Sequence, residues 1–128
     1  MKLLLDTHIW IWSKSDPERI GKRAAKELSS QENQLWLSPV SVWEALALMQ
    51  KRRIRMENPL AWVERAAEQL SEAPLTQEIV RTAFALPWTH SDPADRFLAA
   101  TAKVLDLTLV TADQKLLGLG EIATLANR

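Results

Sequence analysis

The stretch Lys2-Leu3-Leu4-Leu5-Asp6 decides the fold that we expect for this chain. A short, uninterrupted apolar run predicts a strand that is buried on both faces, as in a parallel sheet. The same pattern returns in Leu107-Thr108-Leu109-Val110, which is the clearest strand of the sequence. An acid follows each of the two runs, Asp6 directly and Asp113 after Thr111-Ala112. Both strands are therefore expected to end beside a carboxylate.

Amphipathic segments with helix start signals alternate with short apolar runs along the rest of the chain. The predicted strands are residues 2–5, 34–37, 73–75, 107–110 and 123–125. The predicted helices are 8–13, 16–29, one from Ser38 or Ser41 to the basic run 51–55, then 58–70, 76–86, 92–105, and one from Thr111 or Asp113 to Gly118 or Gly120. This alternation predicts an α/β sandwich around a mostly parallel sheet. Ligands of such sheets bind beyond the carboxyl ends of the strands.

Two further acids stand where predicted helices begin. Glu44 lies in Ser41-Val42-Trp43-Glu44, and Asp95 lies in Asp92-Pro93-Ala94-Asp95. In a parallel sheet, strand ends and the first turns of following helices share one edge, so all four acids are expected to converge there. Clustered carboxylates repel one another and lose hydration, so they usually need a cation. The arrangement therefore predicts a divalent-metal site and phosphoryl-group chemistry.

Each acid taken alone also has a purely structural interpretation. Ser41 and Glu44 fit a helix capping box, and Asp92 before Pro93 is a good N-cap. Asp6 and Asp113 could each cap the helix that follows a strand. Asp95 faces a definite direction inside its helix, so we favour it as the ligand, with Asp92 as the cap and only a second choice for the site.

Other polar side chains near the acids are expected to support them. Thr7 and Thr111 are candidates for hydrogen bonds to carboxylates or water around a metal. His8 and His90 are placed to line the cleft or meet a substrate. Among the six tryptophans, Trp36 and Trp43 are expected in the core, and a partner surface or stacking platform could use Trp10, Trp12, Trp62 and Trp88.

Length and composition bound the class of protein. A chain of 128 residues is expected to form one domain, residues 1–128. Without cysteine, thiolate metal sites are excluded, and oxygen ligands suit Mg²⁺ or Mn²⁺. The net charge of zero provides no strongly basic surface that would itself indicate nucleic-acid binding. No signal peptide or spanning segment is visible, so we expect a cytoplasmic protein without membrane contact.

The ordered set of motifs resembles PIN-domain ribonucleases, and among them the VapC-type toxins of bacterial toxin–antitoxin pairs. The resemblance covers nearly the whole chain and is carried by Leu3-Leu4-Leu5-Asp6-Thr7-His8, Ser38-Pro39-Val40-Ser41-Val42-Trp43-Glu44, His90-Ser91-Asp92-Pro93-Ala94-Asp95-Arg96-Phe97-Leu98-Ala99-Ala100-Thr101-Ala102 and Leu109-Val110-Thr111-Ala112-Asp113. It implies a three-layer α/β/α sandwich and Mg²⁺- or Mn²⁺-dependent hydrolysis of RNA. It also implies a neutralising VapB-type antitoxin and a homodimer, for which Trp10, Trp12 and Trp62 are available.

The resemblance places the catalytic acids at Asp6, Glu44, Asp95 and Asp113. We interpret Asp6 and Asp95 as the principal metal ligands, with Glu44 and Asp113 binding a second metal or orienting water. One alternative is a non-catalytic PIN-like module that binds RNA or protein. A second is a Mg²⁺-dependent phosphatase of the haloacid dehalogenase type. That family expects a second Asp two residues after the first, where this chain has His8.

Overall fold

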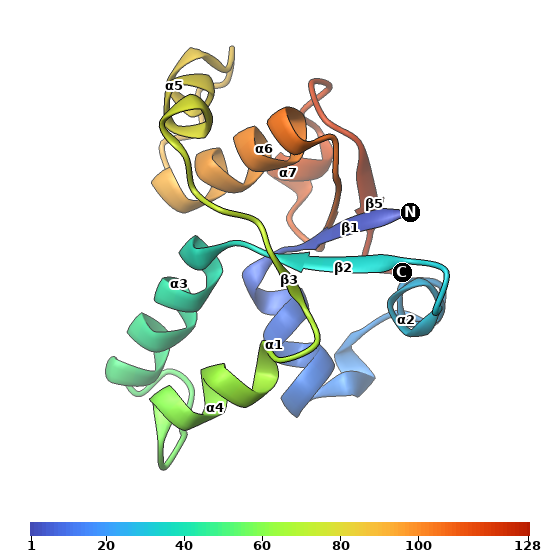
Figure 1. The fold of residues 1–128 in the computed structure, drawn as a ribbon, viewed down its shortest axis with the longest axis vertical. Helices are drawn as coiled ribbons and strands as arrows, with labels where there is room; N and C mark the ends of the chain where they lie inside the picture. The colour runs from blue at the N-terminus through green and yellow to red at the C-terminus, as the bar shows by residue number, and fades with distance from the viewer.

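The computed structural model describes residues 1–128 and contains one five-stranded sheet in the order β3-β2-β1-β4-β5 (Figure 1). All four strand pairings are parallel, which confirms the expected sheet. The strands are β1 (Lys2–Leu5), β2 (Gln34–Leu37), β3 (Ser71–Glu72), β4 (Thr108–Thr111) and β5 (Thr124–Ala126). The N-terminal apolar run is thus the central strand.

Register places the carboxyl ends of β1 and β4 side by side. Leu5 pairs with Val110, and the Asp6 backbone amide donates to the Val110 carbonyl over 3.0 Å. Residues that follow either strand therefore emerge at the same edge of the sheet. The chain needs crossovers of many residues to keep every strand parallel, and helices supply them.

The helices form a layer on each face of the sheet (Figure 1). They are α1 (Thr7–Ser15), the 3₁₀ helix η1 (Pro17–Arg19), α2 (Lys22–Ser29), α3 (Pro39–Gln50), α4 (Pro59–Ala66), α5 (Gln77–Ala85), α6 (Pro93–Leu105) and α7 (Gln114–Leu117). Leu3 and Leu5 pack with α1, α3 and α4, whereas Leu4 packs with α5, α6 and α7. This alternation follows the two-residue period of a strand and yields the expected α/β/α sandwich. No helix combines the length and the apolar character needed to cross a membrane.

Most predicted elements differ from the structure by one or two residues at their ends, and two differ by more. The helix expected over 16–29 is divided between η1 and α2 at Ile20 and Gly21. The C-terminus lies against this break: a Cβ on Gly21 would sit 1.7 Å from the Arg128 carbonyl carbon, and the Gly21 amide donates to Asn127 Oδ1 over 2.8 Å. The helix expected to reach residue 70 ends at Ala66, so β3 begins two residues before the predicted 73–75 strand.

The tryptophans are distributed differently from the prediction. Trp36 packs against the core as expected, but Trp43 is 68% exposed, because the buried side of α3 is formed by Ser41, Ala45 and Met49. Trp10 is fully buried, and its indole N–H donates to the Ala66 carbonyl over 3.0 Å. Trp10 therefore cannot contribute to a partner surface.

Candidate active site

The carboxyl edge of the sheet brings the four singled-out acids into one cavity of about 420 Å³. Asp6 follows β1, Asp113 follows β4, Glu44 lies in α3 and Asp95 in the first turn of α6. The cavity is lined by Asp6, His8, Trp12, Glu44, Asp92, Asp95, Ala112 and Asp113. Four chain segments that are far apart in sequence thus each contribute a carboxylate.

Asp6 is buried and hydrogen-bonded through both carboxylate oxygens. Its Oδ1 accepts from the Thr7 amide over 2.8 Å, which caps α1, and its Oδ2 accepts from the Thr111 hydroxyl over 2.6 Å. Thr111 Oγ1 in turn accepts from the Asp113 amide over 3.0 Å. Burial raises the pKa of Asp6, and the Thr111 and Thr7 hydrogen bonds offset part of that rise. Thr111 therefore connects the strand-end acids of β1 and β4.

Glu44 is held by Thr7, whose hydroxyl donates to Glu44 Oε1. The Ser41 hydroxyl is buried 2.9 Å from the same Thr7 oxygen, a contact that sequence reasoning did not anticipate. Burial raises the pKa of Glu44, with Asp6 and Asp92 adding to the rise. The capping-box interpretation is wrong, because Ser38 caps α3 by accepting from the Val40 amide. Glu44 lines the cavity instead.

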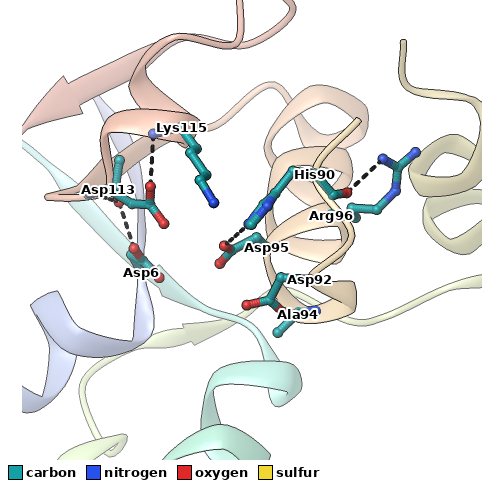
Figure 2. A network of polar contacts seen from close by, with 9 residues as sticks. Asp6, His90, Asp92, Ala94, Asp95, Arg96, Asp113 and Lys115 are labelled. Atoms are coloured by element: carbon teal, nitrogen blue, oxygen red, sulfur yellow. Dashed lines mark hydrogen bonds and ion pairs between the residues drawn. The ribbon is translucent and has the colours of Figure 1, made fainter. Parts of the chain in front are cut away.

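Asp95 lies in a polar contact with His90 (Figure 2). Asp95 Oδ2 and His90 Nε2 are 2.8 Å apart, and the two side chains are only 13% and 15% exposed. Burial raises the pKa of Asp95 to about 6; His90 lowers it, and the neighbouring acids Asp92, Asp6 and Asp113 raise it further. One donor atom each from His90, Asp95 and Asp113 lies within 4.8 Å of the others.

Arg96 fixes the segment that carries His90, and sequence reasoning missed it. Its guanidinium donates to backbone carbonyls at the end of α5 and in the following loop, those of Ala83, Phe84, Leu86, Trp88 and His90. A cation in the first turn of a helix opposes the helix dipole. Because Arg96 stands at the start of a helix, where its charge is unfavourable, the sequence did contain a signal that its side chain has a specific partner.

The remaining candidates lie where the sequence placed them. Asp92 is exposed, accepts from the Ala94 amide over 3.0 Å as the N-cap of α6, and also lines the cavity. His8 is exposed and lines the same cavity. Asp113 accepts from the Lys115 amide over 2.8 Å and so caps α7 (Figure 2).

The donor set fits a hard divalent cation. It consists of carboxylate oxygens, with His90 Nε2 beside Asp95 and with no thiol. The ion pairs of Lys and Arg in the chain, Arg19 with Asp16 and Lys103 with Glu121, involve none of the cavity acids. Several carboxylates therefore share a cavity in which no lysine or arginine pairs with them, and a divalent cation would neutralise that charge.

Comparison with known proteins gives one family and one fold. The sequence matches the family described as PIN domain over residues 3–122. It is 34% identical over 116 residues to Ribonuclease VapC22 of Mycobacterium tuberculosis, a match that covers 89% of this chain and 88% of that protein. The fold is similar to VapBC2 from Rickettsia felis bound to a promoter DNA fragment (TM-score 0.77, 16% identity, 98% of each chain). It is also similar to DNA-bound VapBC from Salmonella typhimurium (TM-score 0.75, 20% identity, 100% and 99% of the chains).

Proposed function

This chain belongs to the PIN-domain family, and from that premise we propose that it is a divalent-metal-dependent endoribonuclease acting as the toxin of a toxin–antitoxin pair. The observation that carries the proposal is the convergence of Asp6, Glu44, Asp95 and Asp113 on one cavity without a Lys or Arg ion pair. The relative that is 34% identical to this chain is a ribonuclease, which supports RNA as the substrate class.

Within this proposal, Asp6 and Asp95 are the principal ligands of Mg²⁺ or Mn²⁺, with Glu44 and Asp113 binding a second ion or orienting water. When bound, the cation acidifies water and offsets the charge of the RNA phosphate. Thr7 and Thr111 keep the Glu44 and Asp6 carboxylates in fixed orientations through hydrogen bonds. Fixed orientation matters because misplaced groups lose much of the benefit of proximity.

Lys115 is the cationic side chain best placed to hold RNA. Figure 2 shows it extending from α7 toward the space between Asp113 and His90. It lines a second cavity beside the acids, together with His90, Ser91 and Gln114. Lys115 is exposed and makes no ion pair, so its ammonium is free to contact a phosphate oxygen of a substrate strand.

The proposed partners are a VapB-type antitoxin and a second copy of this chain. The antitoxin proposal rests on the similar folds from VapBC complexes. For a homodimer, burial excludes Trp10, and Trp12 and Trp62 are partly buried against the core, so the more exposed apolar side chains are the candidates. Trp43 and Leu75 share a groove and are exposed, and Val80 and Phe84 are exposed one turn apart on α5. Light scattering of W43A/F84A should then give a monomer where the unaltered protein gives a dimer.

The test of the proposed reaction is cleavage of a mixed RNA pool with Mg²⁺, with Mn²⁺ and with EDTA. We expect metal-dependent cleavage that Asp6→Asn and Asp95→Asn abolish. Glu121→Gln is the matched control, because it removes an acid that pairs only with Lys103, away from the cavity. Undiminished cleavage in EDTA would reject the metal-dependent reaction. Metal binding without cleavage of any RNA would instead favour the non-catalytic module, and release of phosphate from small phosphomonoesters would favour the phosphatase.

A further inference from the structure

His90 is more firmly placed than a solvent-facing histidine needs to be. Its backbone carbonyl and that of Trp88 accept from the Arg96 guanidinium over 3.1 and 2.6 Å. Its ring packs against the Trp88 ring, with centroids 4.8 Å apart and planes inclined by 56°. The arginine clamp and the aromatic neighbour together fix both ends of the residue, and Nε2 is directed toward Asp95 (Figure 2).

The distance between Nε2 and the Asp95 carboxylate is that of two neighbouring metal ligands. A small divalent ion holds its ligands at about 2.1 Å, so neighbouring ligand atoms of an octahedron are about 3 Å apart and opposite ones about 4.2 Å. His90 Nε2 lies 2.8 Å from Asp95 Oδ2, and the donor atoms of His90, Asp95 and Asp113 all lie within 4.8 Å. A hydrogen bond also spans 2.8 Å. Without metal, a proton therefore joins Nε2 to the Asp95 carboxylate. With metal bound, the same two atoms would be neighbouring ligands of one ion.

The three donors come from two distant parts of the chain. His90 lies in the loop before α6, Asp95 in that helix, and Asp113 after β4. Such an arrangement around a point is what a coordination site requires. The second histidine of the chain, His8, lines the cavity but is not part of this group.

We propose that His90 is a nitrogen ligand of the divalent cation, bound beside Asp95 and Asp113, and that it makes the site prefer Mn²⁺ over Mg²⁺. This inference rests on the proposed metal-dependent function. The preference follows from ligand chemistry: imidazole nitrogen suits transition-metal ions, whereas Mg²⁺ is bound through oxygen and water. Replacing imidazole by an amide should therefore weaken Mn²⁺ binding more than Mg²⁺ binding.

The direct experiment is pulsed electron paramagnetic resonance of the Mn²⁺-loaded protein, which detects magnetic nuclei bonded to the metal. The protein is prepared with natural nitrogen and with ¹⁵N only in histidine. We expect a ligated nitrogen whose signal changes from ¹⁴N to ¹⁵N on labelling. His90→Gln should lose it and His8→Gln should keep it. The His8 variant is a matched control, since His8 is the other histidine of the chain and lines the acidic cavity without belonging to the group of three donors.

Calorimetric titration of both variants with Mn²⁺ and Mg²⁺ gives a second readout without catalysis. We expect the ratio of Mn²⁺ to Mg²⁺ affinity to fall about tenfold in His90→Gln, the lower end of what altered metal surroundings cost, and to be unchanged in His8→Gln. Mn²⁺ binding to the unaltered protein without a histidine nitrogen signal would overturn the inference and leave the proposed reaction intact. This outcome is read from the spectrum of the unaltered protein, so it does not depend on whether a variant folds. Failure of the unaltered protein to bind either ion would overturn both.

Discussion

Replacing Asp95 with Asn should stabilise the metal-free protein near neutral pH. The pKa of Asp95 is raised from 3.8 to about 6, first by burial and then by the neighbouring acids. Since one pKa unit is worth about 1.4 kcal/mol, the ionised form costs about 3 kcal/mol of folding free energy above pH 6. Solvent screening in an open cavity reduces this to the order of 2 kcal/mol. Weakening of the His90 contact removes about 1 kcal/mol of the gain.

The dependence on pH identifies the cause. Below pH 3.8 the carboxyl group is protonated in the folded and the unfolded chain, so its ionisation costs nothing. As pH rises from 3.8 to about 6 the folded protein loses stability, because the unfolded chain ionises there while the buried carboxyl group stays protonated, and the loss is complete above about 6. In EDTA, Asp95→Asn should therefore melt about 4 °C or more above the unaltered protein at pH 7.5, and the difference should shrink toward pH 4.

Divalent metal should reverse the order. Mn²⁺ at about 100 times its dissociation constant stabilises the unaltered protein by about 2.7 kcal/mol, and the variant by much less. Asp92→Asn is the control for the loss of one negative charge from the cavity. It leaves Asp95 in place and keeps the oxygen that accepts from the Ala94 amide. An equal or lower melting temperature for metal-free Asp95→Asn at pH 7.5 would refute the reasoning.

Three other substitutions probe the supports of the site and the fold. Thr111→Val removes the hydroxyl between Asp6 and Asp113 and should weaken Mn²⁺ binding about tenfold by calorimetry; unchanged affinity would contradict the role of this hydroxyl. Lys115→Ala should raise KM for RNA and lower the salt dependence of binding by about one phosphate contact, with little change in melting temperature. Leu109→Ala removes a fully buried side chain of the central sheet and should cost about 2–5 kcal/mol in urea unfolding.

The sheet and the acids were predictable because each rests on local chemistry. The mostly apolar runs at 2–5 and 107–110 favour deep burial, and parallel pairing then brings their carboxyl ends together. The register that places Leu5 beside Val110 fixes Asp6 beside the exit of β4. Convergence of the acids thus follows from topology rather than from any single motif.

Features that depend on distant contacts were not predictable. Gly21 breaks the helix expected over 16–29 because the C-terminal Arg128 passes against it, more than a hundred residues away in sequence. Trp43 was expected in the core, but helical phase places Ser41 and Ala45 inward and leaves the indole outside. The small residues Ser41 and Ala45 give little hydrophobic signal for the buried face of α3. The large apolar side chain of Trp43 therefore suggested the wrong face as the buried one.

Helix capping and site formation also proved not to be competing interpretations. Asp6 caps α1 through Oδ1 and uses Oδ2 for Thr111, and Asp113 caps α7 through Oδ1 (Figure 2). A carboxylate at the start of a helix that follows a parallel strand stands at the open edge of the sheet, and the cap occupies only part of its bonding capacity. Capping therefore fixes the carboxylate in the orientation that a site at this edge requires. The same residue type at the same place satisfies both demands, so the sequence signal of a cap cannot by itself argue against a ligand.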